Sequence, residues 1–137
     1  MIKAIKDFID IHNSPYMFPS CPSCGSMGDY NDNNKRLWGS RGVRFLKALS
    51  QELKAEVKTD RNKSGIIDRG YVGGFFSKNG KVVYVSVSDS GCIRDFGEIL
   101  YRTARDTKDY TGGANNFAKI SEEGIGILKG KLAEMLV

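Results

Sequence analysis

The chain has 137 residues, of which 27% are charged, and a formal net charge of +5. Leu, Ile, Val and Phe make up about a quarter of the residues, above the roughly 20% below which disorder becomes the better prediction. No apolar run approaches the ~18 residues of a membrane span, and the N-terminus lacks the cleavage site of a secretion signal. Three cysteines, an odd number without an export signal, favour reduced thiols or a metal site. We therefore expect one globular domain, residues 1–137, in the cytoplasm and without a membrane partner.

Two amphipathic helices are predicted in the first half of the chain, separated by an irregular segment. Residues 2–12 repeat apolar side chains at helical spacing. Residues 13–39 contain all three prolines and keep no period, and so long a connection inside a compact domain usually has a function, binds a metal or is disordered. Residues 40–56 again follow a helical period, with Ser40 as the N-terminal cap. The apolar stripe of this second helix consists of Val43, Leu46, Leu49 and Leu53.

A small sheet and two further helices are predicted in the second half. Short strands are predicted at 57–59, 66–67, 71–76 and 81–88. The pair Asn79-Gly80 marks a hairpin between the last two, because both residues accept the positive φ of a tight turn. A third helix is predicted from Asp89 or Ser90 to Tyr110, and a fourth begins at Ser121. The sequence thus predicts an α+β fold in the order α-α-β-β-β-α-α, with three or four mainly antiparallel strands and the helices packed on one face of the sheet.

The positive charge is concentrated in one stretch of the chain. Residues 35–81 contain twelve Lys or Arg against four Asp or Glu, whereas the rest of the chain contains nine against twelve. In the second helix long cations recur every three or four residues, so they lie on one face and suit the phosphates of a nucleic acid, while a nearby tryptophan is suited to stacking on a base. This candidate nucleic-acid or anion-binding surface comprises Arg36, Trp38, Arg41, Arg44, Lys47, Lys54 and Lys58. The alternative is an ordinary solvated helix face.

Two cysteines lie close together in the irregular segment. The run Cys21-Pro22-Ser23-Cys24-Gly25 resembles one knuckle of a zinc ribbon, in which two thiolates hold one side of a tetrahedral ion. A complete ribbon has a second such pair, which this sequence lacks, and the remaining soft ligands are one histidine and one further cysteine. The candidate set for a structural zinc is therefore His12, Cys21, Cys24 and Cys92. Free or buried thiols are the alternative.

A second candidate anion site follows at the end of the third predicted helix. Exposed backbone amides beside cations bind phosphates and nucleotides, and three cations here come just before a Thr-Gly-Gly turn. The candidate phosphate loop comprises Arg102, Arg105, Lys108, Thr111, Gly112 and Gly113. The alternative is a glycine C-cap followed by a turn. Opposite charges four residues apart, such as Arg105 and Asp109, predict ion pairs on an exposed face of the same helix.

The sequence offers little for catalysis. It contains one histidine and none of the common zinc-protease, serine-hydrolase or phosphate-loop motifs, so no catalytic residue is assigned and a non-enzymatic role is favoured. The leading hypothesis is a small basic protein that binds nucleic acid, or a complex that handles it, through the second helix. The first alternative is an inhibitor or adaptor that binds an acidic protein surface. The second is a nucleotide-binding or nucleotide-processing protein.

Overall fold

The computed structural model describes residues 2–13, 32–62, 71–88 and 98–137. The elements in chain order are α1 (Lys3–His12), α2 (Asp32–Leu53), β1 (Glu56–Asn62), β2 (Tyr71–Lys78), β3 (Lys81–Ser88), β4 (Glu98–Ala104), β5 (Asn116–Lys119) and α3 (Glu122–Met135). The α+β class is confirmed. The described residues form five strands, where three or four were predicted, and three helices, where four were predicted.

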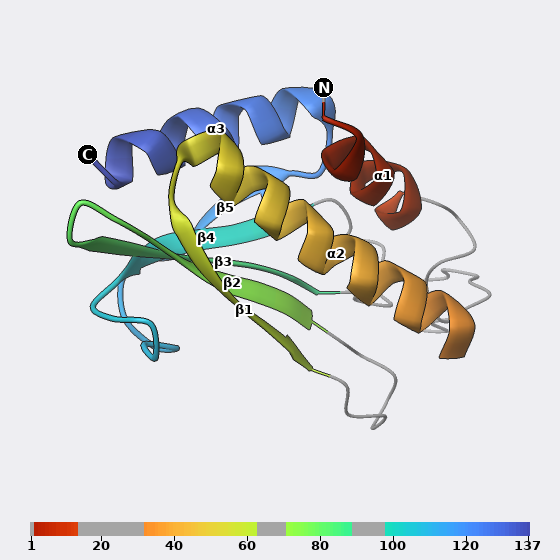
Figure 1. Ribbon diagram of the computed structural model, residues 1–137, viewed down its shortest axis with the longest axis horizontal. Helices are drawn as coiled ribbons and strands as arrows, with labels where there is room; N and C mark the ends of the chain where they lie inside the picture. The colour runs from red at the N-terminus through yellow and green to blue at the C-terminus, as the bar shows by residue number, and fades with distance from the viewer. Residues whose placement is uncertain (1, 14–31, 63–70, 89–97) are drawn as a thin grey trace.

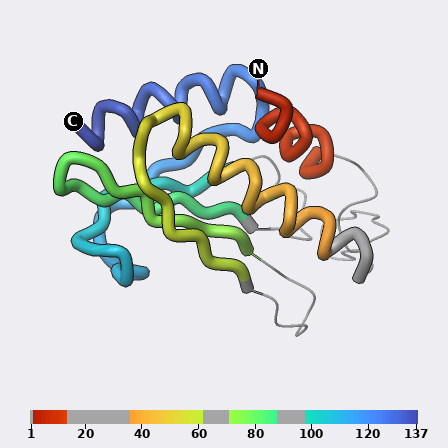
Figure 2. The backbone as a smooth tube through the Cα atoms, viewed as in Figure 1, coloured from red at the N-terminus to blue at the C-terminus, as the bar shows by residue number. Residues whose placement is uncertain are grey.

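The five strands form one antiparallel sheet in the order β1-β2-β3-β4-β5, so each strand pairs with its neighbour in the chain. All three helices lie on one side of this sheet, with α2 crossing it and both α1 and α3 lying beside α2 (Figure 1). The connection from β4 to β5 turns beneath the opposite side of the sheet (Figure 2). None of the helices among the described residues combines the length and the apolar character needed to cross a bilayer.

The core lies between the helices and the sheet. Val83, Val85 and Val87 alternate along β3 and are at most 3% exposed, which is the two-residue period that the sequence predicts for a strand covered on one face. The rings of Phe8 on α1 and Phe45 on α2 stack with centroids 4.9 Å apart. Burying a side chain of this size stabilises a fold by about 1.5–3 kcal/mol. This stack holds α1 against α2, and α2 in turn packs on β1 and β2 of the sheet.

The bounds predicted for the second helix are corrected at both ends. Helix α2 begins at Asp32, so the irregular segment predicted over 13–39 is wrong for its last eight residues, while 14–31 lie outside the described residues. The helix extends this far because Trp38 continues its buried stripe and is itself only 1% exposed. Ser40 therefore lies within the helix, and its hydroxyl donates to the carbonyl of Leu37 at 3.1 Å rather than acting as a cap. At the other end, Lys54 adopts φ 53° and the helix stops at Leu53.

The helix predicted from Asp89 or Ser90 to Tyr110 is wrong over its described residues, because Glu98–Ala104 form strand β4. Ile99 and Tyr101 turn toward the helices and are at most 8% exposed, with the intervening residue on the other face. Leu100 and Ala104 lie four residues apart, which suggested the apolar stripe of a helix. The same residues also fit the two-residue alternation of a strand, and the pairing with β3 favours the strand. The fourth predicted helix is confirmed as α3, and the hydroxyl of Ser121 accepts the Gly124 amide at 3.0 Å.

Candidate functional site

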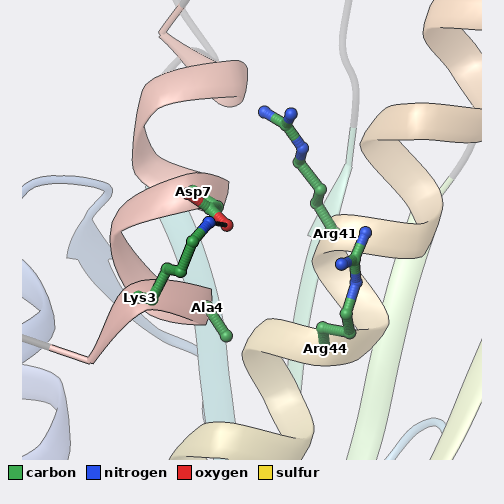
Figure 3. A pocket seen from close by; sticks show the side chains of 5 residues that line it. All are labelled: Lys3, Ala4, Asp7, Arg41 and Arg44. Carbon is green, nitrogen blue, oxygen red and sulfur yellow. Dashed lines mark hydrogen bonds and ion pairs between the residues drawn. The ribbon is translucent and has the colours of Figure 1, made fainter.

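Helices α1 and α2 pack side by side and leave a groove of about 320 Å³ between them on the solvent side. Its lining residues are Lys3, Ala4 and Asp7 from α1 and Arg41 and Arg44 from α2. Figure 3 shows the charged side chains of the two helices gathered around this groove. The rings of Phe8 and Phe45, both buried, stack between the two helices that form the groove.

The groove is positively charged. The ammonium of Lys3 forms an ion pair with the carboxylate of Asp7 at 2.9 Å. The Lys3 hydrogen bond is the largest cause of the lowered pKa of Asp7, and the positive charges of Arg41 and Arg44 lower it further. The Nε of Arg44 reaches the carbonyl of Ser40 at 3.5 Å. In the part of the chain that the structure describes, no carboxylate lies within ion-pair distance of Arg41 or Arg44.

The charge continues along the outer face of α2. Lys47 lies one turn beyond Arg44 and is exposed. Glu52 is the one acidic residue in 36–53, and its carboxylate pairs at 3.4 Å with the ammonium of Lys129 on α3. The structure therefore brings Arg41, Arg44 and Lys47 together as predicted neighbours and adds Lys3. The sequence could not reveal Lys3, because its place depends on how α1 packs against α2.

The other members of the predicted surface lie elsewhere. Trp38 is 1% exposed, and its Nε1 donates to Nδ1 of His12 at 3.1 Å, so its ring is part of the core in this structure. Lys54 follows the end of α2. Lys58 lies on β1 opposite Phe75, on the face of the sheet away from the helices. The row read from the sequence as one helix face is thus divided by the end of α2.

Arg36 is exposed near the start of α2, and a second cation adjoins it that the sequence analysis did not single out. The guanidinium of Arg61 on β1 donates to the carbonyl of Arg36 at 3.2 Å. Gly39 makes this approach possible, because a Cβ at that position would clash with the Arg61 guanidinium. This contact ties the edge strand to α2. A glycine in a helix interior costs about 1 kcal/mol relative to alanine. Its presence at position 39 could therefore have indicated that another group approaches the helix closely there.

In the predicted phosphate loop, the carboxylate of Asp109 occupies the backbone donors. It accepts from the amides of Arg105 at 3.0 Å, Gly112 at 2.8 Å and Thr111 at 3.3 Å. These hydrogen bonds, that of the Arg105 amide first, hold the pKa of Asp109 far below its usual range. The Arg105–Asp109 ion pair exists at 3.3 Å, in a turn instead of a helix. An external phosphate would have to displace Asp109 from these donors.

Of the remaining two cations of that loop, Arg102 is buried and hydrogen-bonded within the connection, whereas Lys108 is exposed. Arg102 is 3% exposed, donates to the Asp109 carbonyl at 2.6 Å and lies over the Tyr84 ring at 4.8 Å. The Lys108 amide donates to the Asp106 carboxylate at 2.8 Å, and Gly113 adopts φ 78° at the end of the turn. The loop is thus built around its own carboxylate.

Of the candidate zinc set, the structure describes His12 alone, since Cys21, Cys24 and Cys92 lie outside the described residues. Burial lowers the pKa of His12 to about 4, which keeps the ring neutral at physiological pH. Within the described ranges no group of three or more His, Cys, Asp or Glu is placed to hold a metal ion. The zinc set stays a prediction.

A cluster of tyrosines on the other face of the sheet has no counterpart in the sequence analysis. The Asp60 carboxylate accepts the hydroxyls of Tyr71 at 2.8 Å and Tyr110 at 2.9 Å. Burial first, and then Asp60, raises the pKa of Tyr71 to about 12. The Tyr110 ring meets Phe75 edge to face at 5.1 Å, so these contacts pin the β4–β5 connection to β1. Asp60 and Tyr110 are fifty residues apart in the chain, and no local pattern predicts their meeting.

Two guanidiniums that no carboxylate of the described residues pairs with therefore lie in the α1–α2 groove, with Lys47 one turn further along α2, whereas Asp109 occupies backbone donors of the β4–β5 connection. Comparisons of the chain with protein-family models, with curated proteins and with solved structures find no match, so a function is inferred from the chemistry of this surface.

Proposed function

We propose that the protein binds nucleic acid through the outer face of α2, where Arg41, Arg44 and Lys47 contact the phosphate backbone. The observation that carries this proposal is a row of long cations that no carboxylate of the described residues pairs with. Residues three apart rise about 4.5 Å along a helix, which is of the order of the ~3.4 Å axial rise per phosphate of a DNA strand. A guanidinium also binds two phosphate oxygens at once, which an ammonium does not.

The excess of positive over negative charge on α2 favours a role in binding over a role in keeping the protein soluble. A surface that serves solubility intersperses both signs. In 36–53, four Arg or Lys stand against the single Glu52, and Lys129 of α3 neutralises that carboxylate. The face therefore keeps an unbalanced positive potential, which attracts polyanions and speeds their association.

Fluorescence anisotropy with labelled single- and double-stranded DNA and RNA tests the proposal. Three phosphate contacts predict an affinity that falls by about 20- to 40-fold between 50 and 200 mM salt, because each contact contributes about 0.7–0.9 to the logarithmic slope. The absence of binding to all four probes at 50 mM salt would overturn the proposal. An acidic protein partner would then be the better account of the same charges.

Two matched double variants test whether binding depends on the α2 face or on the net charge of the protein. Arg44→Glu with Lys47→Glu reverses two charges in the row, and Lys119→Glu with Lys131→Glu reverses two exposed charges on β5 and α3. Both double variants change the net charge by the same amount. We expect the first to abolish binding at physiological salt and the second to keep most of it. Equal losses would show that binding follows total charge and not the α2 face. Circular dichroism checks that both variants fold.

A further inference from the structure

The groove differs in shape from the rest of the basic row. Lys47 projects from a convex helix face, which suits a continuous backbone lying across it. Arg41, by contrast, is half-buried and lines a concave space of about 320 Å³ between two helices. Figure 3 shows Arg41 and Arg44 on one side of that space and Lys3 with Asp7 on the other. Concave sites of about 300–1,000 Å³ are where proteins usually bind compact ligands.

The net charge of the groove indicates which class of ligand it binds. Lys3 and Asp7 neutralise each other at 2.9 Å, so the uncompensated charge is that of the two guanidiniums of Arg41 and Arg44. A phosphodiester carries one negative charge, whereas a phosphate monoester carries roughly −1.5 to −2 at pH 7. Two guanidinium forks also match the three free oxygens of a monoester better than the two of a diester. Charge and donor number therefore both favour a terminal phosphate.

We propose that the α1–α2 groove binds the terminal phosphate monoester of a nucleic acid, held by the guanidiniums of Arg41 and Arg44. This inference rests on the proposed function, because the adjoining backbone runs from the groove along α2 to Lys47. Lys47 lies one helical turn from Arg44, so it contacts the next phosphodiester. Ala4 is the smallest side chain of the lining and leaves room for the phosphate beside α1.

Asp7 sets the strength of this site. Its carboxylate engages the ammonium of Lys3 and adds a negative charge near the phosphate. Removing that charge with the isosteric Asp7→Asn frees Lys3 to become a third donor. The variant therefore binds a terminal phosphate more tightly than the unmodified protein does, by about two- to fivefold, the effect expected for one exposed charge. Equal or weaker binding by Asp7→Asn would contradict the charge balance on which the site depends.

The deciding measurement compares one oligonucleotide with a 5′-phosphate, with a 3′-phosphate or with hydroxyls at both ends, by anisotropy competition. We expect one phosphorylated form to bind about tenfold more tightly than the hydroxyl form, as charged hydrogen bonds of ordinary strength give. Arg41→Gln should remove this ratio. The matched control Lys47→Gln should lower the affinity for both forms and leave the ratio unchanged.

The outcomes distinguish the two proposals. If all three oligonucleotides bind equally, the inference fails while the proposed function stands. If none binds at low salt, the nucleic-acid proposal fails. A nucleoside monophosphate and its nucleoside serve as further competitors: a monophosphate that binds as tightly as the phosphorylated oligonucleotide keeps the monoester site but identifies free nucleotides as its source. If the monophosphate competes no better than the nucleoside and all oligonucleotides bind alike, the groove is no monoester site.

Discussion

The Nε1 of Trp38 on α2 donates a hydrogen bond of 3.1 Å to the Nδ1 of His12 on α1. Both side chains are 1% exposed, and Phe8 lies 5.7 Å from the His12 ring and 5.8 Å from the Trp38 ring. This hydrogen bond requires a neutral imidazole, because a protonated ring has no acceptor. The pair therefore joins α1 to α2, and the protonation of His12 affects how firmly the two helices are joined.

Stability is expected to fall as the pH drops below the ordinary range of histidine. Burial lowers the pKa of His12 to about 4, whereas the unfolded chain has a value near 6.5. Between these values the unfolded state binds one proton more than the folded state, so the free energy of unfolding decreases by about 1.4 kcal/mol per pH unit. The free energy of unfolding, measured with urea, should thus be about 2 kcal/mol lower at pH 5 than at pH 7 because of His12.

The control for this pH dependence is His12→Gln, which keeps an acceptor for the indole but does not titrate in this range. The variant should be less stable than the parent at pH 7, because its amide packs less well beside Phe8, yet its stability should change less between pH 7 and pH 5. The same decrease in both proteins would show that other groups cause the pH dependence.

The sequence predicts an element correctly where its apolar pattern fits either a helix or a strand but not both. The valines of β3, the Asn79-Gly80 turn and the cap at Ser121 were all predicted and are confirmed. It was insufficient at β4, where Leu100 and Ala104 fit a helical stripe while Ile99 and Tyr101 fit a strand. Local sequence cannot decide between these periods, because the pairing with β3 that favours the strand is a tertiary contact.

The candidate site was predictable in part for the same reason. Arg41, Arg44 and Lys47 share a face because helix geometry alone puts them there. Lys58 was wrongly continued along the same row, since the left-handed conformation of Lys54 ends the helix before it. Lys3 enters the groove through the packing of α1 on α2, which no spacing along the chain encodes.

Three glycines of α3 give opposite predictions for one substitution. At Gly126 and Gly130 an added Cβ would meet nothing within 4 Å, so alanine should stabilise the protein by about 1 kcal/mol at each site through its higher helix propensity. At Gly124 the Cβ would clash with the backbone carbonyl of Lys119, and alanine should destabilise it by about 1–3 kcal/mol. Chemical denaturation of the three single variants tests this order, which an equal effect at all three would refute.

Lys54 predicts a gain in stability from a charge-removing substitution. Its φ of 53° lies in the left-handed region, which costs a residue with a side chain roughly 1–2 kcal/mol and costs glycine little. Lys54→Gly should therefore stabilise the protein by about 1 kcal/mol, whereas Lys54→Ala should not. Because Lys54 lies beyond the end of α2, the salt dependence of nucleic-acid binding should be the same in Lys54→Gly. A shallower slope would place Lys54 among the phosphate contacts.

Asp109 acts in the β4–β5 connection as a built-in anion, and its removal should create a site for an external one. In Asp109→Ala the amides of Arg105, Thr111 and Gly112 lose their acceptor, so the thermal midpoint should fall and these amides should exchange hydrogen faster. Sulfate supplies the missing acceptor oxygens and should restore part of the loss. Since sulfate also stabilises proteins in general, the quantity that decides is the excess rise in the variant over the unmodified protein. An equal rise of the thermal midpoint with sulfate in both proteins would contradict this prediction. It would mean that the connection rearranges when Asp109 is lost and leaves no anion site.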